Sequence, residues 1–485
     1  MKHIGFRFTA GVSAVVERAI LPVLSALCLT LPVHAATRPH YGGTLRLEMR
    51  ARVASLDPRE WPADSTGAAA AERLASLVYD RLVRVDENGR VQTALAVSWQ
   101  HDADSKRWQF RLRPGVKFHD GTPLTPDRAA AALHPLLGNE RPVSVSGEWL
   151  VIQSSQSMPD LPAELARGRH FISHTTSEGL TGTGAFRVAE WEPRRRLLLA
   201  ANEEYWAGRP FLDSIAVEMG VHASEQLIHL ELSKADVVEL SPDQVRRALQ
   251  SGARTWSSAP AELLILVFNL RRPAVQDVRL RQAVALSIDR SSIVNVLLQK
   301  QGEAAGGLLP QWLSGYAFLF PVAADVERAK QLRHKLSAAA PLALVYDSDD
   351  ALVRAVAERV AVNARAVGIS VQVSGARSDA TAGADVRLIR LRLGSTDPRV
   401  ALDSLLASLG ALESLPPAGA VPEQLYAAER ALVESLRVVP LAHLPETYGL
   451  GPRVKNWMPR RSGGWRLEDL WLDTSSRADE SGGKP

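Results

Sequence analysis

The chain has 485 residues, a formal net charge of +4, 46% hydrophobic residues and 23% charged residues. Its length exceeds what one compact core accommodates and predicts two or three domains, and its composition is typical of a soluble globular protein. The small net charge argues against a nucleic-acid partner, which requires a basic stripe or patch. The densest basic run, Arg194–Arg196, is short, and we expect it at a solvated turn before a strand.

Residues 1–35 have the organisation of an export signal. Basic residues precede the apolar run Ala19–Leu31, which is too short to span a bilayer comfortably, and Ala35 ends a small-residue cleavage site. The only cysteine, Cys28, follows Leu27 rather than the small residue that a lipoprotein site needs. Cleavage after Ala35 would remove this cysteine, so the mature protein would hold no disulfide. We predict an exported, soluble, periplasmic protein, with an uncleaved anchor as the alternative.

Gly42-Gly43-Thr44-Leu45-Arg46-Leu47 is followed by Ser55-Leu56-Asp57-Pro58, and the family resemblance given below implies that these segments are the first strand and its exit. Strand ends in open α/β sheets commonly face ligands, which makes Ser55 and Asp57 candidate ligand residues. The alternative for Asp57 is a turn carboxylate before a proline. A helix is expected over residues 69–82, because its leucines and valine recur on one face.

Residues 107–127 predict a small β structure followed by a helix. Trp108, Phe110 and Leu112 alternate with polar residues, the period of a strand with one buried face. Pro114-Gly115 predicts a turn, and residues 116–118 a second short strand. Thr125 is expected to cap a helix that begins at Pro126.

Two later motifs have features of metal or cofactor sites. His170 and His174 have a spacing that places two ligands on one helical face, but no third ligand is identifiable, so we expect no metal site. Gly182 and Gly184 allow a tight return of the backbone. They lack the third glycine of a dinucleotide fingerprint, and we expect no cofactor.

The second half of the sequence predicts further α/β structure. Residues 263–270 form a nearly continuous apolar run, as expected of a strand buried on both faces, and Asn269 at its exit either bonds backbone groups of a hinge or forms a simple turn. Helices are expected to begin at residues 241–244 and to cover 291–298. The family resemblance given below implies a ligand-side loop at 306–316, in which Trp312 and Tyr316 would line a cleft.

A parallel βαβ unit is predicted over residues 342–373. The strand at 342–346 leads to a helix capped by Asp349 or Asp350, Gly368 ends this helix, and a second strand follows at 369–373.

Several of these segments resemble the signature motifs of the family 5 extracellular solute-binding proteins, the dipeptide, oligopeptide and nickel receptors of ABC importers. The motifs are G-G-T-L-R at 42–46, S-L-D-P at 55–58, W-x-F-x-L-R-x-G-V-K-F-H-D-G-T-P-L-T at 108–125, G-T-G-A-F-R-V at 182–188, D-V-R-L-R-Q-A at 277–283, S-I-D-R at 287–290 and D-P at 397–398. The resemblance implies an α/β fold of the periplasmic-binding-protein type II-like class, with two hinged lobes and a small satellite domain.

The same resemblance implies a domain organisation. After the signal peptide, 1–35, lobe 1 would comprise 36–57, 179–268 and 443–474, the satellite domain 58–178, and lobe 2 269–442, with a disordered tail at 475–485.

The implied function is a non-enzymatic periplasmic receptor. It would capture a peptide or peptide-like ligand between the lobes and deliver it, as a monomer, to an ABC permease in the inner membrane. A second hypothesis is a degenerate sensor or scaffold, because residues 140–175 and 399–421 lack the family's motifs. A third is a secreted hydrolase, against which no G-x-S-x-G elbow appears and Asp102 and Asp104 look solvated.

The ligand is less clearly implied. Peptide-binding relatives carry an aspartate three residues before Asp-Pro that holds the peptide's amino group, whereas this chain has Gly394 there and no tryptophan nearby. Peptide binding would then depend on Asp397 as the substitute. The predicted ligand residues are Ser55, Asp57, Gly182, Gly184, Asn269, Trp312, Tyr316, Ser395, Thr396 and Asp397.

Overall fold

The computed structural model describes residues 39–61, 66–86, 88–177, 179–336, 340–348, 350–376, 383–411, 416, 419–459 and 465–473. The chain divides into two compact units, residues 1–39 and 40–485, and every element below belongs to the second. The predicted signal peptide and tail lie outside the described residues. Among those described, no helix combines the length and apolarity needed to cross a membrane.

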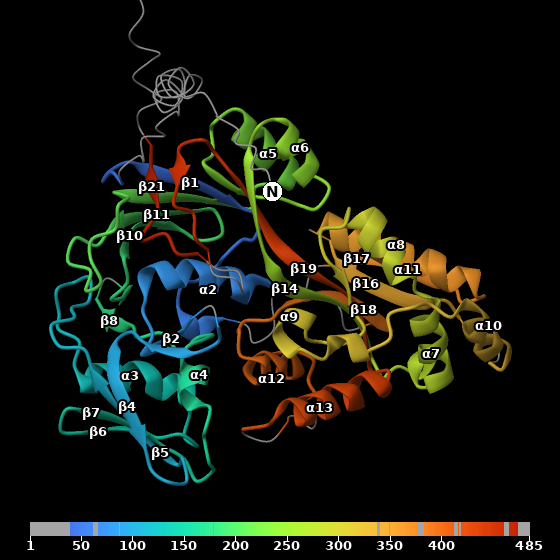
Figure 1. Ribbon diagram of the computed structural model, residues 1–485, viewed down its shortest axis with the longest axis horizontal. Helices are drawn as coiled ribbons and strands as arrows, with labels where there is room; N and C mark the ends of the chain where they lie inside the picture. Colours follow the sequence, from blue (N-terminus) through green and yellow to red (C-terminus); the bar gives the residue numbers. More distant parts are fainter. Residues whose placement is uncertain are drawn as a thin grey trace, which may run out of the picture. The chain divides into compact units, whose positions relative to one another are not determined.

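One eleven-stranded sheet organises the second unit (Figure 1). Its order is β10-β11-β12-β1-β13-β19-β14-β18-β16-β17, and β15 pairs with β19. The strands are β10 (Phe186–Glu192), β11 (Arg196–Ala201), β12 (Ser214–Met219), β1 (Thr44–Met49), β13 (Val237–Glu239), β19 (Val438–Leu450), β14 (Arg254–Phe268), β18 (Val386–Arg392), β16 (Leu342–Asp347), β17 (Val371–Ala376) and β15 (Glu303–Ala304).

The two longest strands join two half-sheets. β19 pairs with β13 at one end, β14 pairs with β18 at the other, and the two pair antiparallel with each other along most of their length. We call the strands from β10 to β13 the first half and β18, β16 and β17 the second half. β1 is parallel to β12 and β13, and β16 is parallel to β17 and β18.

A continuous core supports the first half. The buried face of helix α2 (Thr66–Val78), which carries Leu74, Leu77 and Val78, packs with Leu45 and Leu47 of β1. The helix ends at Val78, four residues earlier than predicted. The carbonyl of Val78 accepts the N–H of Gly184 at 2.9 Å, which ties this end of the helix to the returning chain.

Two cores lie beside the second half, one on each face of the neighbouring strand β14. Leu264 and Leu266 lie in one core, and Leu263 and Ile265 lie in the other, which confirms a strand buried on both faces. The βαβ prediction is also confirmed, because β16, helix α11 (Ala351–Ala366) and β17 follow in order and the strands are parallel.

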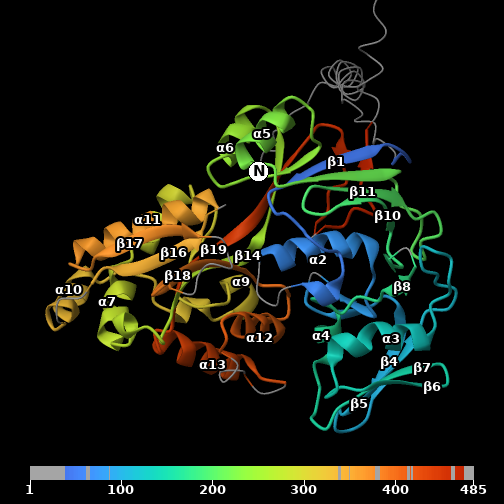
Figure 2. The same cartoon turned by 180° about the vertical axis from the view of Figure 1, so that it is seen from behind.

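A four-stranded antiparallel sheet, order β4-β5-β7-β6, forms a separate small core with helix α3 (Pro126–Leu137) (Figure 2). Its strands are β4 (Ala96–His101), β5 (Arg107–Leu112), β6 (Val143–Ser146) and β7 (Trp149–Gln153). Trp108 and Phe110 of β5 are buried as predicted, and the Thr125 side chain caps α3. The strand predicted at 116–118 is wrong: only an isolated bridge, Lys117 to Pro123, forms.

Two predicted helices also differ. Helix α6 (Val245–Gln250) begins at Val245 rather than at 241–244, since Ser241 Oγ bonds Asp243 and the Ser241 N–H donates to the Gln244 side chain. The helix predicted over 291–298 is a short α8 (Arg290–Ser292) continued by a π-helical turn, η3 (Ile293–Leu297).

The remaining elements connect or cover these sheets. They are η1 (Pro58–Glu60), β2 (Val83–Val85), β3 (Val91–Thr93), α4 (Leu161–Leu165), β8 (His174–Thr176), β9 (Gly179–Thr181), α5 (Ala223–Glu231), η2 (Pro273–Val275), α7 (Val278–Ser287), α9 (Gln311–Ser314), η4 (Ala317–Leu319), α10 (Val326–His334), α12 (Pro398–Ser408), α13 (Pro422–Glu434), β20 (Val454–Lys455) and β21 (Trp471–Leu472). The run Arg194–Arg196 turns into β11 as predicted.

Candidate functional site

The pairing between β14 and β19 is irregular where these strands pass from one half-sheet to the other. The register shifts on both sides of Pro260, which stands opposite Pro445. Neither proline has an N–H to donate to the ladder. Side chains make the local bonds instead, since Ser258 Oγ accepts the Glu446 N–H at 2.9 Å and Trp312 Nε1 donates to the Pro260 carbonyl at 2.8 Å.

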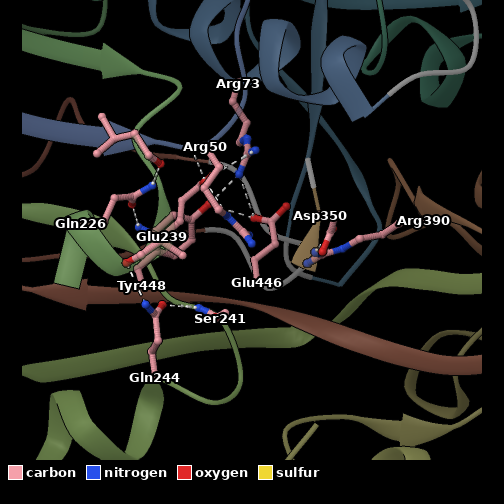
Figure 3. Close-up of polar contacts among 12 residues, drawn as sticks. Arg50, Arg73, Gln226, Glu239, Ser241, Gln244, Asp350, Arg390, Glu446 and Tyr448 are labelled. Carbon is pink, nitrogen blue, oxygen red and sulfur yellow. Dashed lines mark hydrogen bonds and ion pairs between the residues drawn. The ribbon is translucent and has the colours of Figure 1, made fainter. Parts of the chain in front are cut away.

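Eight charged side chains gather beside this irregularity, and Figure 3 shows most of them. They come from seven segments that are distant in sequence, and each is mostly or partly buried. We call them the junction charge cluster: Arg50, Arg73, Glu239, Glu262, Asp350, Arg390, Arg392 and Glu446.

The members from the first half form a bonded group around Glu239. Its carboxylate accepts the Arg50 N–H at 2.8 Å and lies 3.4 Å from Arg73 Nη2. Burial alone would raise the pKa of Glu239, but the charges of Arg73 and Arg50 outweigh burial and hold that pKa below its ordinary value. Glu239 is therefore a carboxylate at neutral pH.

Arg390 of β18 organises a second bonded group, which includes Glu262 of β14 and Asp350. Its guanidinium pairs with Glu262 and, at 3.2 Å, with Asp350. Asp350 also caps α11 by accepting the N–H groups of Leu352 and Val353. Burial would raise the pKa of Asp350, but Arg390 and Arg50 lower it below its ordinary value. This carboxylate, too, is ionised.

Glu446 of β19 joins the two groups. Its Oε1 lies 3.0 Å from Nε of Arg392 on β18, and its Oε2 lies 3.8 Å from Nη1 of Arg73 on α2. Tyr448 donates its hydroxyl to Glu446 Oε2 at 3.1 Å and accepts from Arg73 Nη1 at 2.8 Å. One carboxylate thus pairs with an arginine beside each half-sheet.

The cluster supplies charged and polar groups but no nucleophile–base pair of the kind that acid–base catalysis needs. Among the residues that the structure describes, no group of three or more histidine, cysteine, aspartate or glutamate side chains could hold a metal ion. The arrangement can pair charges and bind polar ligands.

Sequence reasoning missed this cluster, although β18 carried a signal. Arg390 and Arg392 stand two apart in a strand flanked by apolar residues, so both lie on one face of a buried sheet. Buried arginines almost always have partners. That pattern predicts opposing carboxylates, but it does not say that Glu446 and Glu262 supply them.

Ser55 and Asp57 make only local contacts. Ser55 Oγ accepts the Asp57 N–H at 3.0 Å, and Asp57 caps η1. Its carboxylate also binds Arg59, with Nη2 at 2.7 Å from Oδ2. The arrangement matches the turn alternative for Asp57.

Gly182 and Gly184 pack against the end of α2. A Cβ at Gly182 would lie 2.0 Å from the Val78 carbonyl oxygen, and one at Gly184 would lie 2.6 Å from it. Both positions therefore require glycine for packing.

Asn269 and the predicted aromatic residues occupy different surroundings. Asn269 bonds the Ala384 carbonyl and the Arg271 N–H, so it both links to the start of β18 and forms a turn. Tyr316 is buried in a core and donates its hydroxyl to Glu429 at 2.9 Å. Tyr316 is 7% exposed in this structure and Trp312 bonds the Pro260 carbonyl, and the part of both residues in a ligand cleft stays a prediction.

The loop Ser395–Asp397 contacts the hairpin between β2 and β3. Thr396 Oγ1 donates to the Asp86 carbonyl at 3.4 Å, and a Cβ on Gly89 would lie 2.9 Å from the Thr396 carbonyl oxygen. Asp397 caps α12 through Oδ1, at 2.9 Å from the Val400 N–H. The ten predicted ligand residues therefore fall into separate local groups.

His170 and His174 do not share a helical face. His170 Nδ1 bonds the carbonyl groups of Glu164 and Arg167, both at 3.1 Å. His174 lies in strand β8.

Comparison with known proteins places this architecture among binding proteins. The family model "Bacterial extracellular solute-binding proteins, family 5 Middle" matches residues 90–408. The nickel-binding periplasmic protein of Escherichia coli (strain K12) is 24% identical over 346 residues, covering 62% of this chain and 66% of that protein. The dipeptide-binding protein of the same organism is 22% identical, covering 49% and 54%. The chain spans about half to two thirds of these relatives.

Solved structures extend the fold comparison to nearly the whole chain. NikA from Staphylococcus aureus in complex with Ni(L-His)2 has a TM-score of 0.77 at 16% identity and covers 89% of this chain and 100% of its own. The dipeptide binding protein from Pseudoalteromonas sp. SM9913 in complex with Met-Leu has a TM-score of 0.78 at 17% identity, with the same coverage.

Proposed function

Because the chain belongs to family 5 of the bacterial extracellular solute-binding proteins, we propose that it is a periplasmic receptor. It captures a peptide or peptide-like ligand between two lobes and delivers it to an ABC import permease, without catalysing a reaction. The match of the family model to residues 90–408 is the observation that carries the proposal. The fold, of the type II periplasmic-binding-protein class, agrees with it.

We assign the lobes as the sequence predicts. Lobe 1 comprises 36–57, 179–268 and 443–474, lobe 2 comprises 269–442, and the satellite domain comprises 58–178. Separate hydrophobic cores under the two half-sheets and within the four-stranded sheet support a division into three parts. By packing, however, α2 belongs with the core of lobe 1, and residues 263–268 of β14 belong with the cores of the second half.

The hinge of this receptor is the irregular stretch of β14 and β19. A rung of two facing prolines has no backbone N–H donors, so the backbone can rotate there with little loss of ladder bonding. The junction charge cluster lies beside this stretch, with members from both lobes, and we assign it to the ligand site. The ten predicted ligand residues remain candidates for its remaining contacts.

Small-angle scattering of the mature protein, beginning at Ala36, tests the receptor. A saturating ligand should make the protein more compact through hinge closure. A thermal-shift panel of peptides, oligosaccharides and metal chelates supplies that ligand, because a molecule that binds only the folded state raises the melting temperature. Binding without compaction would contradict the two-lobe capture.

A scaffold or sensor is the second candidate, and two observations favour it. The charges of the cluster already pair with one another, and the loop at 395–397 already contacts the β2–β3 hairpin. A scaffold needs no ligand to hold this arrangement. It predicts equal scattering curves with and without every member of the panel, and no change in melting temperature.

A further inference from the structure

We propose that the ligand of the junction charge cluster is uncharged and is recognised through its oxygen acceptors, such as amide carbonyl or hydroxyl groups. This inference rests on the proposed receptor function and names the chemical class of its ligand. Two independent observations carry it: the charge balance of the cluster and its unused hydrogen-bond donors.

The cluster is electrically balanced among the residues that the structure describes. Four guanidinium groups, of Arg50, Arg73, Arg390 and Arg392, face four carboxylates, of Glu239, Glu262, Asp350 and Glu446. Every member lies within 3.8 Å of an opposite charge.

This balance disfavours an ionised ligand. A charge that leaves water for this site loses its hydration, and it gains a counter-charge only by breaking an existing pair. The displaced partner then becomes an unpaired buried charge, which is strongly unfavourable. An uncharged ligand avoids both costs.

The donors of the cluster favour a ligand rich in acceptors. Arginine has five N–H donors and no acceptor. Among the described residues, Nε of Arg73 is buried and makes no hydrogen bond, whereas Nε of Arg392 lies 3.0 Å from Oε1 of Glu446 and is already paired. The Arg50 side chain is 34% exposed and presents a further guanidinium. A carbonyl or hydroxyl oxygen satisfies such donors without adding charge.

The variant Glu446→Gln tests the balance without knowledge of the ligand. It removes one negative charge while keeping the side chain's shape, so Arg73 and Arg392 share one carboxylate fewer. We expect inorganic phosphate to raise the melting temperature of this variant by several degrees over chloride at equal ionic strength. The wild type should show only the smaller difference between the two salts that exclusion of phosphate from the surface gives any folded protein.

Two further variants complete this experiment. Glu262→Gln removes the carboxylate that pairs with Arg390 and should gain the same phosphate response, which keeps the test valid if Glu446→Gln does not fold. Glu434→Gln, which removes an exposed charge paired with Arg430, is the matched control and should gain none. A specific phosphate response in the wild type, or none in either cluster variant, would overturn the inference.

A ligand panel separates this inference from the receptor function. It contains dipeptides blocked at both termini, the same dipeptides with one free terminus, and neutral oligosaccharides. A blocked dipeptide or a neutral oligosaccharide should raise the melting temperature of the wild type. Which of the two does so shows whether the ligand's acceptors are amide carbonyl or hydroxyl oxygens. Stabilisation by charged members alone overturns the inference. If no member of the panel raises the melting temperature, the result counts against the receptor function. The phosphate experiment then still tests whether the charges of the cluster are balanced.

Discussion

Pro260 of β14 stands opposite Pro445 of β19 where the pairing of these two strands shifts register. The rung between them has no N–H donor, and the Pro260 carbonyl is bonded by Nε1 of Trp312 at 2.8 Å. An indole from outside the sheet therefore fixes the backbone at the proposed hinge.

Trp312→Phe should weaken this attachment. The change removes the N–H donor and leaves a carbonyl without that partner, so we expect the free energy of unfolding to fall by about 1–3 kcal/mol. Urea unfolding measures it. Phe318→Leu, on a side chain 72% exposed, is the control and should change little. Equal stability of the two variants would show that the indole N–H contributes nothing at the hinge.

Arg390→Met tests how much the ion pairs of the junction charge cluster contribute to the free energy of unfolding. It leaves Glu262 and Asp350 without their shared guanidinium, and breaking such a buried pair costs about 3–5 kcal/mol. Adding Glu262→Gln should recover part of the loss, and chemical denaturation of the four proteins in this double-mutant cycle measures the coupling. Arg354→Met, in an exposed pair with Glu358, should change the free energy of unfolding little. Additive losses in the cycle would refute the coupling.

Asp80 should make stability depend on pH. Its largely buried carboxylate accepts from Trp206 Nε1 at 2.8 Å and Thr183 Oγ1 at 2.9 Å, and burial raises its pKa to about 6. The folded state then binds the proton more tightly than the unfolded state, whose pKa is near 3.8. Stability is therefore higher below pH 4 on account of this group and falls as pH rises through 6, by about 3 kcal/mol in total.

Asp80→Asn removes this titration. The difference in free energy of unfolding between wild type and variant, measured by denaturation from pH 4 to 8, cancels the groups common to both. We expect the wild type to lose stability relative to the variant as pH rises through 6. Parallel profiles would show that Asp80 titrates alike in both states.

Gly182→Ala should be among the most damaging small changes in the chain. The added Cβ would lie 2.0 Å from the Val78 carbonyl oxygen, so α2 or the returning strand must move. Overpacking of this kind costs about 1–3 kcal/mol or more. Gly383→Ala, with open space around its position, should be tolerated. The melting temperatures of the two variants check this contrast, and similar values would contradict it.

Local patterns predicted much of the fold. The alternation in β5, the Thr125 cap and the apolar run of β14 each depend on neighbours a few residues away, and the structure has all three. The start of α6 was missed because Ser241 and Gln244 bond each other. The strand at 116–118 failed because the Phe118 carbonyl accepts the Gly121 N–H and the Thr122 N–H bonds the Asp120 side chain, so a tight turn ends the pairing after one bridge.

The candidate site was less accessible from sequence, since its bonds are long-range. Arg73, Glu239 and Glu446 are brought together by three different elements, and none carries a local motif. The spacing of Arg390 and Arg392 indicated a buried pair of charges but not their partners. The positions named from motif resemblance make local contacts in this structure, since Asp57 and Asp397 cap helices and Gly182 packs against α2, and their part in ligand binding stays a prediction.

The place of β14 in the sheet governs the order in which the protein is assembled. Both neighbours of β14 follow it in the chain, β18 at residues 386–392 and β19 at 438–450, although β14 ends at Phe268. During synthesis from the N-terminus, this apolar strand emerges before either partner exists. One edge stays open until residue 392 has been made and the other until residue 450, so the newborn chain requires protection from aggregation over this stretch of its translation.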